Sequence, residues 1–160
     1  RQLRMVGPPR RLLFDLDKTL WSHYTVEHDH RPFDAERVAH ERVPPGHTRM
    51  LRELALEGHH LHICSRSSER DKCLDILNAA FPSVPFQSVQ IYPTPRNKLK
   101  HVTAALGDTV KSPFWFFDDE PHILQHLAEK FPLATLVHTP NGIGTGTLYT
   151  GGNKPQQYNK

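Results

Sequence analysis

The sequence has little cysteine and no long apolar run, and each absence removes a class of protein. Only two cysteines, Cys64 and Cys73, occur among 160 residues, so neither a disulfide framework nor a thiolate zinc site is indicated. No run approaches the ~18 apolar residues that a membrane-spanning helix requires, and no signal peptide is recognisable. We therefore expect a reducing compartment, the cytoplasm with the nucleus as the alternative, and no membrane partner.

Charge of either sign is also limited. The chain carries 20 Lys and Arg against 17 Asp and Glu, a formal charge of +3, and its pI is about 9.0. Nucleic-acid binding needs clustered Lys and Arg. Here the basic residues are spread out, apart from Arg10-Arg11 and the segment 96–100. We expect no nucleic-acid partner, whereas an anionic substrate is compatible with the mild positive charge.

Length and composition fit one globular domain. Hydrophobic residues make up 37% of the 160 residues and charged residues 23%, which is ordinary for a soluble globular chain. A chain of this length can bury a substantial core. We predict a single domain over residues 1–160 with its core at about 10–140. Residues 139–160, in which Gly, Thr, Asn and Gln predominate, are predicted to form a loosely held tail.

Histidine is abundant, with 12 residues in the chain. Two groups are conspicuous: His23, His28 and His30 in a polar loop, and His59, His60 and His62 at a strand start. Neither group has the ligand spacing of a zinc site. Because histidine is usually at or near the surface, we predict solvated loop residues rather than a metal centre.

Apolar runs typical of buried strands alternate with helical apolar periods. The predicted strands are residues 11–16, 60–64, 86–91, 114–117 and 134–138. Helices are expected after Pro45, after an N-cap at Ser67 or Ser68, near Lys98 with Asn97 as its cap, and at Pro121. The excursion 21–45 shows only a short helix, at about 35–40. The four consecutive aromatics at 114–117 are too apolar for an exposed edge and mark a central strand.

This alternation predicts an α/β fold. We expect a Rossmann-like, doubly wound three-layer α/β/α sandwich with a mainly parallel central sheet. In such open sheets ligands bind at the carboxyl ends of the strands. The side chains at those ends are therefore the candidates for function.

Polar side chains follow four of the predicted strands. They are Asp15 and Asp17 after the first, Ser65 after the second, Lys98 beyond the third, and Asp118 and Asp119 after the fourth. Carboxylates, one ammonium and one hydroxyl at one rim are typical of a site for a hard divalent cation and a phosphate. Taken singly, the same residues are equally compatible with a solvated Asp pair, a surface lysine and a helix cap. Their combination in this order favours the site.

The first strand end allows two geometries. Alternation along an extended strand places Asp15 and Asp17 on one face. If the chain turns after Asp15, the backbone carbonyl of Asp17 can instead point inward beside the Asp15 side chain. Two carboxylates this close repel each other unless a cation or a shared proton offsets the charge.

Four segments resemble the motifs of the haloacid dehalogenase (HAD) phosphatase superfamily in chain order: FDLDKTLW, ICSRSS, the lysine that follows YPTPRN, and FFDDE. The words LWS, SRSSE, YP and FFDDE further resemble the eukaryotic magnesium-dependent, acid-phosphatase-like branch over about residues 10–140. The resemblance implies a magnesium-dependent phosphomonoesterase that works through an aspartyl-phosphate. The gaps where relatives insert a cap domain are short here, so we expect a capless enzyme with an open mouth.

The resemblance also assigns catalytic and metal-binding roles. Asp15 matches the nucleophile, and Asp17 matches the general acid/base whose backbone carbonyl also binds magnesium. Lys98 matches the lysine that neutralises the phosphate. Asp118 and Asp119 match the carboxylates that hold the cation directly or through water, and the sequence leaves open which of them does so directly.

Phosphate binding is implied for Leu16, Ser65, Arg66 and Ser67, together with the catalytic lysine. Lys18 is a departure from the family pattern, because relatives usually carry an aromatic or another residue there. It is expected to place a cation beside the pocket, which puts an inherited substrate preference in doubt.

The implied substrates are phosphorylated proteins of the phosphotyrosine type or phosphorylated small molecules such as sugar phosphates, including fructosamine-phosphate-like compounds. One alternative is a phosphoserine phosphatase of the polymerase-tail type, which uses a similar first motif but carries a long insert that is absent here. Another is a catalytically silent binding module with the HAD fold, for which the intact motifs would have no use. The oligomeric state stays open.

Overall fold

The computed structural model describes residues 8–22, 30–144, 147–149 and 156–157. Its elements are β1 (Arg11–Phe14), α1 (Ala35–Arg42), α2 (Pro45–Leu56), β2 (His60–Ser65), α3 (Arg70–Ala80), β3 (Phe86–Ile91), α4 (Leu99–Leu106), the 3-10 helix η1 (Gly107–Lys111), β4 (Trp115–Asp118), α5 (Pro121–Lys130), β5 (Thr135–His138), β6 (Thr147–Tyr149) and β7 (Gln156–Gln157). Within these residues, no helix combines the length and the apolar character that crossing a bilayer demands.

The strands form one sheet in the order β3-β2-β1-β4-β5-β6-β7. The pairs from β3 through β5 are parallel, whereas β6 and β7 pair antiparallel. The chain moves from β1 outward to β3 and then crosses to β4 on the other side of β1. Strand order therefore reverses between β1 and β4, which is the point where open α/β sheets bind ligands. The position of β4 between β1 and β5 confirms the predicted central strand.

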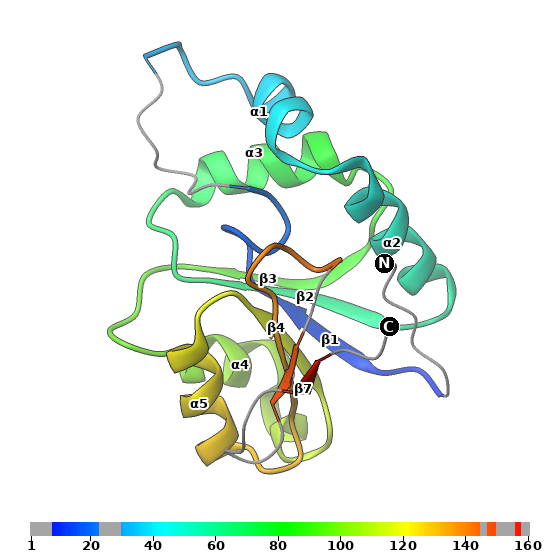
Figure 1. Ribbon diagram of the computed structural model, residues 1–160, viewed down its shortest axis with the longest axis vertical. Coiled ribbons are helices and arrows are strands. Elements are labelled where there is room, and N and C mark those ends of the chain that lie inside the picture. The colour runs from blue at the N-terminus through cyan, green and yellow to red at the C-terminus, as the bar shows by residue number, and fades with distance from the viewer. Residues whose placement is uncertain (1–7, 23–29, 145–146, 150–155, 158–160) are drawn as a thin grey trace.

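Alternate side chains of the strands enter two apolar cores, one on each face of the sheet. Leu12, Phe14 and Phe117 pack with α1, α2 and α3, whereas Leu13 and Phe116 pack with α4 and α5. The rings of Phe14 and Phe117 stack with centroids 4.7 Å apart and join β1 to β4. Figure 1 shows the same division, with α1–α3 on one side of the sheet and α4 and α5 on the other. The predicted three-layer α/β/α fold is confirmed.

The prediction of a loose tail from residue 139 onward is wrong for the segment that follows β5. Thr139 is fully buried, and Ile143 is only 2% exposed. The amide of Ile143 donates to the carbonyl of Thr19 at 3.2 Å, and Thr147–Tyr149 pairs with β5. Polar composition misleads here because backbone hydrogen bonds to the sheet and to the loop after β1 hold the segment in place. Residues 145–146, 150–155 and 158–160 lie outside the described residues.

The prediction of solvated histidines is wrong for His59 and His62, each 6% exposed. The Nδ1 atom of His59 accepts from the amide of Arg10 at 3.0 Å, and the Nδ1 atom of His62 bonds Ser88 Oγ at 2.8 Å. Both imidazoles are therefore part of the packing around β2. Of the other four, His30 and His60 are exposed, and His23 and His28 lie outside the described residues.

Candidate active site

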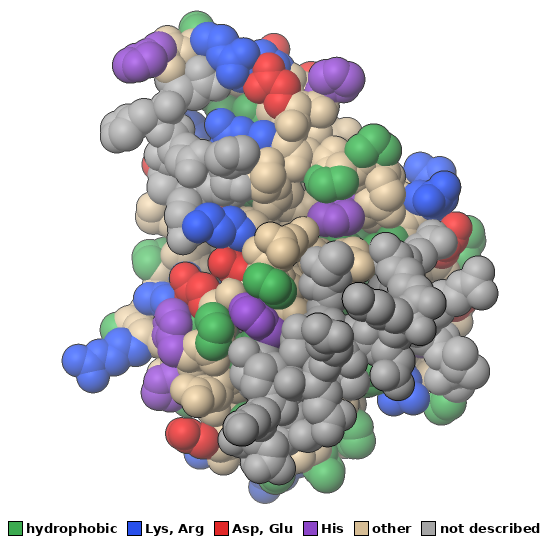
Figure 2. All heavy atoms as spheres, in the orientation of Figure 1, with side chains coloured by type: hydrophobic (Ala, Val, Ile, Leu, Met, Phe, Trp, Pro, Cys, Tyr) green, Lys and Arg blue, Asp and Glu red, His purple; other side chains and the backbone are tan. Residues whose placement is uncertain are grey.

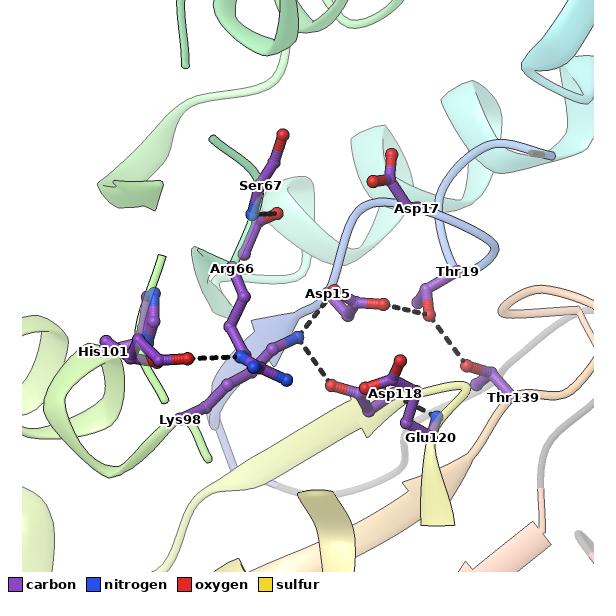
Figure 3. Close-up of polar contacts among 12 residues, drawn as sticks. Asp15, Asp17, Thr19, Arg66, Ser67, Lys98, His101, Asp118, Glu120 and Thr139 are labelled. Atoms are coloured by element: carbon purple, nitrogen blue, oxygen red, sulfur yellow. Dashed lines mark hydrogen bonds and ion pairs between the residues drawn. The ribbon is translucent and has the colours of Figure 1, made fainter. Parts of the chain in front are cut away.

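Side chains from four segments meet where β1, β2 and β4 end, at the reversal of strand order. Asp15 follows β1, Ser65 closes β2, Lys98 immediately precedes α4, and Asp118 closes β4. Asp119 follows at the same rim and lines one pocket with Asp15, Ser65 and Lys98. The convergence predicted from the strand ends is therefore present in the structure (Figure 3).

Lys98 is the buried cation of this site. Its Nζ atom lies 2.6 Å from Asp15 Oδ1 and 2.6 Å from Asp118 Oδ2, and the residue is 2% exposed. Burial alone would lower the pKa of Lys98, but the two carboxylates outweigh it, and the pKa is raised. The ammonium therefore stays charged. It carries three protons, so these two bonds leave one for a phosphate oxygen.

Three carboxylates, including the two that bind this lysine, form a cluster. One oxygen atom from each of Asp15, Asp118 and Asp119 lies within 4.8 Å of the others. Burial and the neighbouring charge of Asp15 raise the pKa of Asp118 to about 6 and that of Asp119 to about 8. Raised pKa values of this kind arise when carboxylates repel one another in a buried site. A bound hard cation would offset that repulsion, and oxygen donors are the ligands that magnesium prefers.

The loop after β1 turns instead of continuing as a strand. The carbonyl of Leu16 accepts from the amides of Thr19 at 3.0 Å and Leu20 at 2.9 Å, and Lys18 has the left-handed φ of 64°. The turned geometry is thus the one adopted, and β1 ends before Asp15. Leu16 is fully buried and does not line the pocket, so its predicted role in phosphate binding stays a prediction.

Asp17 lines the same pocket, but its carboxylate points away from Asp15 and Lys98 (Figure 3). The indole Nε1 of Trp21 donates to Asp17 Oδ1 at 2.9 Å. Trp21 is 1% exposed, so this donor is held rigidly by the core. The two aspartates of the first motif therefore have different surroundings. Asp15 contacts the ammonium of Lys98, whereas Asp17 lies at the pocket wall and accepts a hydrogen bond from the buried indole of Trp21.

The loop after β2 presents hydroxyl groups in series. The amide of Ser67 donates to Ser65 Oγ at 3.2 Å, and the amide of Glu69 donates to Ser67 Oγ at 3.1 Å. The predicted N-cap at Ser67 or Ser68 is wrong, because α3 begins at Arg70 with Glu69 as N-cap and no side-chain cap bond. Since Ser65 Oγ accepts, its own proton remains to be donated to a phosphate oxygen.

The pocket above these groups has a volume of about 300 Å³. Arg66 lines it and is held by a 2.9 Å bond from its Nε to the carbonyl of Thr94. Pro93 and Glu120 complete the rim, and no residue of α1 or α2 lines the pocket. Among the described residues, then, nothing resembling a cap covers it. Figure 2 shows acidic and basic side chains side by side on this part of the surface.

Lys18 does not line this pocket. It lines a second cavity, of about 490 Å³, together with Ser22, His47 and Asn141. Its charge is therefore no guide to the substrate in the carboxylate pocket.

Three residues of the site have no role in the sequence-based prediction. Trp21 holds Asp17, Thr19 Oγ1 donates to Asp15 Oδ2 at 3.2 Å, and Thr139 Oγ1 bonds Thr19 Oγ1 at 3.1 Å. Trp21 and Thr19 belong to the first motif, so their place in the sequence marked them as neighbours of the site. Nothing in the sequence marks Thr139, because its approach depends on the path of the chain after β5.

A mainly parallel sheet that gathers three carboxylates and one buried lysine in one pocket at its switch point is suited to act on phosphate groups, and it defines a Rossmann-like enzyme of the HAD type. Residues 8–154 match the family described as acid phosphatase. The chain therefore belongs to the acid phosphatase family of the HAD superfamily, as the four motifs predicted, and is a hydrolase of phosphate esters. No curated protein matches the chain.

Proposed function

We propose that this protein is a magnesium-dependent phosphomonoesterase that works through an aspartyl-phosphate on Asp15. The observation that carries the proposal is the environment of the Asp15 carboxylate. It lies on the wall of an open pocket, 2.6 Å from a buried ammonium and within 4.8 Å of the Asp118 and Asp119 oxygens. A carboxylate is a weak base, but it suffices as a nucleophile when it is desolvated and aligned beside positive charge.

The residues present fit a magnesium ion. Asp15, Asp118 and Asp119 supply carboxylate oxygens, and the backbone carbonyl of Asp17 is the fourth ligand that the family pattern assigns. When bound, the cation neutralises charge on the phosphoryl oxygens during transfer. Asp118 already accepts from Lys98 and, through Oδ1, from the amide of Glu120 at 2.9 Å. These bonds fix the orientation of its carboxylate, as the partners of metal-binding carboxylates commonly do.

In the proposed complex the hydroxyl of Ser65 and the remaining proton of Lys98 donate to the phosphate oxygens, and Arg66 and Ser67 line the same pocket. The backbone N–H of Leu16 is a further donor that the family pattern assigns. Phosphate monoesters hydrolyse extremely slowly without a catalyst. Fixed donors and positive charge in a site shielded from water therefore contribute more than basicity does.

The reaction then proceeds in two displacements. An oxygen of Asp15 attacks phosphorus, the bond to the ester oxygen breaks, and the proton of Asp17 passes to the leaving oxygen. Asp17, now a carboxylate, removes a proton from a water molecule that attacks the same phosphorus. The bond to Asp15 breaks, and inorganic phosphate leaves with Asp17 protonated again. Because Asp17 points away from Asp15, its carboxylate must rotate toward the leaving group before it can act.

The proposed substrates are phosphorylated proteins of the phosphotyrosine type and phosphorylated small molecules such as sugar phosphates. Support comes from the open rim at Pro93 and Thr94, which leaves room for a group larger than phosphate. No nucleic acid or membrane is proposed as a partner. Cys64 and Cys73 are both buried and outside any disulfide, which supports a reducing compartment, the cytoplasm or the nucleus.

The test is hydrolysis of p-nitrophenyl phosphate by the purified chain, with magnesium or with a chelator, beside the Asp15→Asn variant. The proposal predicts turnover that requires magnesium and that Asp15→Asn lowers by more than a thousandfold without loss of folding. Equal activity in the chelator would remove the metal from the mechanism. No activity in the wild-type protein on any phosphomonoester would favour a silent binding module instead.

A further inference from the structure

Two threonines that lie far apart in the sequence extend from Asp15 into the interior. Thr19 Oγ1 is 3.2 Å from Asp15 Oδ2, and Thr139 Oγ1 is 3.1 Å from Thr19 Oγ1. Both threonines are fully buried, and Asp15 is 6% exposed. Figure 3 shows Asp15, Thr19 and Thr139 in series, with both threonines on the side of the carboxylate opposite Lys98. No part of the mechanism above uses Thr139.

The direction of these bonds follows from the number of protons. An ionised carboxylate can only accept, so the single hydroxyl proton of Thr19 is used on Asp15. The bond between the two threonines must then be donated by Thr139. Thr19 both donates and accepts, and the two bonds together fix the rotation of its hydroxyl group. Without the hydroxyl of Thr139, only the bond to Asp15 would fix the rotation of the Thr19 hydroxyl group.

The backbone around Thr139 is tied to both central strand ends. Its amide donates to the carbonyl of Asp118 at 2.9 Å, and its carbonyl accepts from the amide of Gly142 at 3.2 Å. The next residue, Ile143, donates to the carbonyl of Thr19 at 3.2 Å. The turn after β5 is therefore attached to the ends of β1 and β4 at once, and Thr139 is held at a fixed distance from the first motif.

We propose that Thr139 is a positioning residue for the nucleophile, acting through Thr19. Lys98 holds Oδ1 of Asp15, and the Thr139–Thr19 pair holds Oδ2, so the carboxylate cannot rotate about its Cβ–Cγ bond. Alignment of the attacking oxygen with phosphorus is where catalytic geometry has its largest effect on rate. The inference rests on the proposed function, because Asp15 must be the nucleophile for its orientation to matter.

The test compares Thr139→Val, which keeps the shape, with Thr139→Ser, which keeps the hydroxyl. Loss of one neutral hydrogen bond predicts roughly a 3- to 10-fold lower kcat for Thr139→Val, with KM within about twofold because phosphate-binding groups are untouched. Thr139→Ser should restore kcat. Thr135→Val is the matched control, since Thr135 lies at the start of β5, the strand that precedes Thr139, in register with Trp115. Its kcat should equal that of wild type.

A double-mutant cycle with Thr19→Val separates positioning from packing. If Thr139 acts through Thr19, Thr139→Val should lower kcat no further once Thr19 is Val. The inference would be overturned if the fold-decreases in kcat of the two single variants multiplied in the double variant. A Thr139→Ser variant as slow as Thr139→Val, or a Thr139→Val variant with the kcat of wild type, would overturn it as well. Should Thr139→Val not accumulate as folded protein, Thr139→Ala takes its place in the cycle. Absence of wild-type turnover would instead refute the proposed function, so the two failures are distinguishable.

Discussion

Replacing Lys98 by Met tests the charge arrangement of the site most severely. The side chain keeps its length and apolar stem, but the ammonium between Asp15 and Asp118 disappears. Both carboxylates stay in place, at 6% and 0% exposure. Removing one partner of a buried ion pair costs about 3–5 kcal/mol, because the remaining charge is neither solvated nor paired. Lys98→Met should lower the free energy of unfolding by about that amount.

The assay is urea unfolding at 25 °C, with and without magnesium, followed by activity measurements on the folded protein. Magnesium should recover part of the lost stability, because a ligand that binds only the folded state stabilises it. Activity should stay at least about a hundredfold below wild type, since a charged donor to the phosphate is missing. Adding Asp118→Asn to Lys98→Met should raise stability again without restoring turnover.

The control is Lys100→Met, which removes an exposed ammonium from α4, two residues further along the chain. That ammonium lies 5.4 Å from the ring centre of Tyr92, an exposed contact worth about 0.5–1 kcal/mol. Lys98→Met with stability within 1 kcal/mol of Lys100→Met would refute the reasoning. So would a double variant with Asp118→Asn that is no more stable than Lys98→Met alone.

Further tests use the first motif, a buried histidine and two glycines. Trp21→Phe removes the hydrogen bond that holds the Asp17 carboxylate away from Asp15. Because this carboxylate must turn toward the leaving group to act, hydrolysis of an alkyl phosphate should become roughly 3- to 10-fold faster and that of p-nitrophenyl phosphate less so; slower hydrolysis of the alkyl phosphate would contradict this role of Asp17. Burial, with nearby positive charge, lowers the pKa of His62 from 6.5 to about 4, so the unfolded state binds more protons between these values and the free energy of unfolding should fall as pH drops from 6.5 to 4. In urea titrations His62→Gln should lose stability less steeply over that range, and an unchanged slope would count against the shift. A Cβ at Gly142, where φ is 93°, would lie 3.0 Å from an imidazole carbon of His47, so Gly142→Ala should lower the free energy of unfolding by about 1–2 kcal/mol. Gly46 lies in open space at the start of α2, so Gly46→Ala should raise the free energy of unfolding by about 0.5–1 kcal/mol. Thermal unfolding compares the two variants, and equal effects would contradict the prediction.

The gathering of polar groups could be predicted from sequence because parallel strands place all their carboxyl ends at one edge. Asp15, Ser65 and Asp118 each follow an apolar run, so the position of each run fixed the position of its polar residue. Lys98 was found the same way, one connector beyond β3. The order of parallel strands in the sheet brings these residues together, rather than any pattern within one segment.

The parts that sequence could not predict depend on contacts between distant segments. The segment after β5 is polar, and its composition predicts a loose tail, yet Thr139 and Ile143 are buried and bonded to the loop after β1. Composition reports how much apolar surface a segment can bury, but not whether its backbone finds partners.

The most direct test of the mechanism is to look for the covalent intermediate. Asp17→Asn keeps its backbone carbonyl but has no base to activate water, so an activated ester such as p-nitrophenyl phosphate should load Asp15 faster than the phosphoryl group is released. Intact-protein mass spectrometry after an acid quench should show one added phosphoryl group on Asp17→Asn and none on Asp15→Asn. An adduct on Asp15→Asn, or one that peptide mapping places on Ser65, would contradict the assignment of the nucleophile.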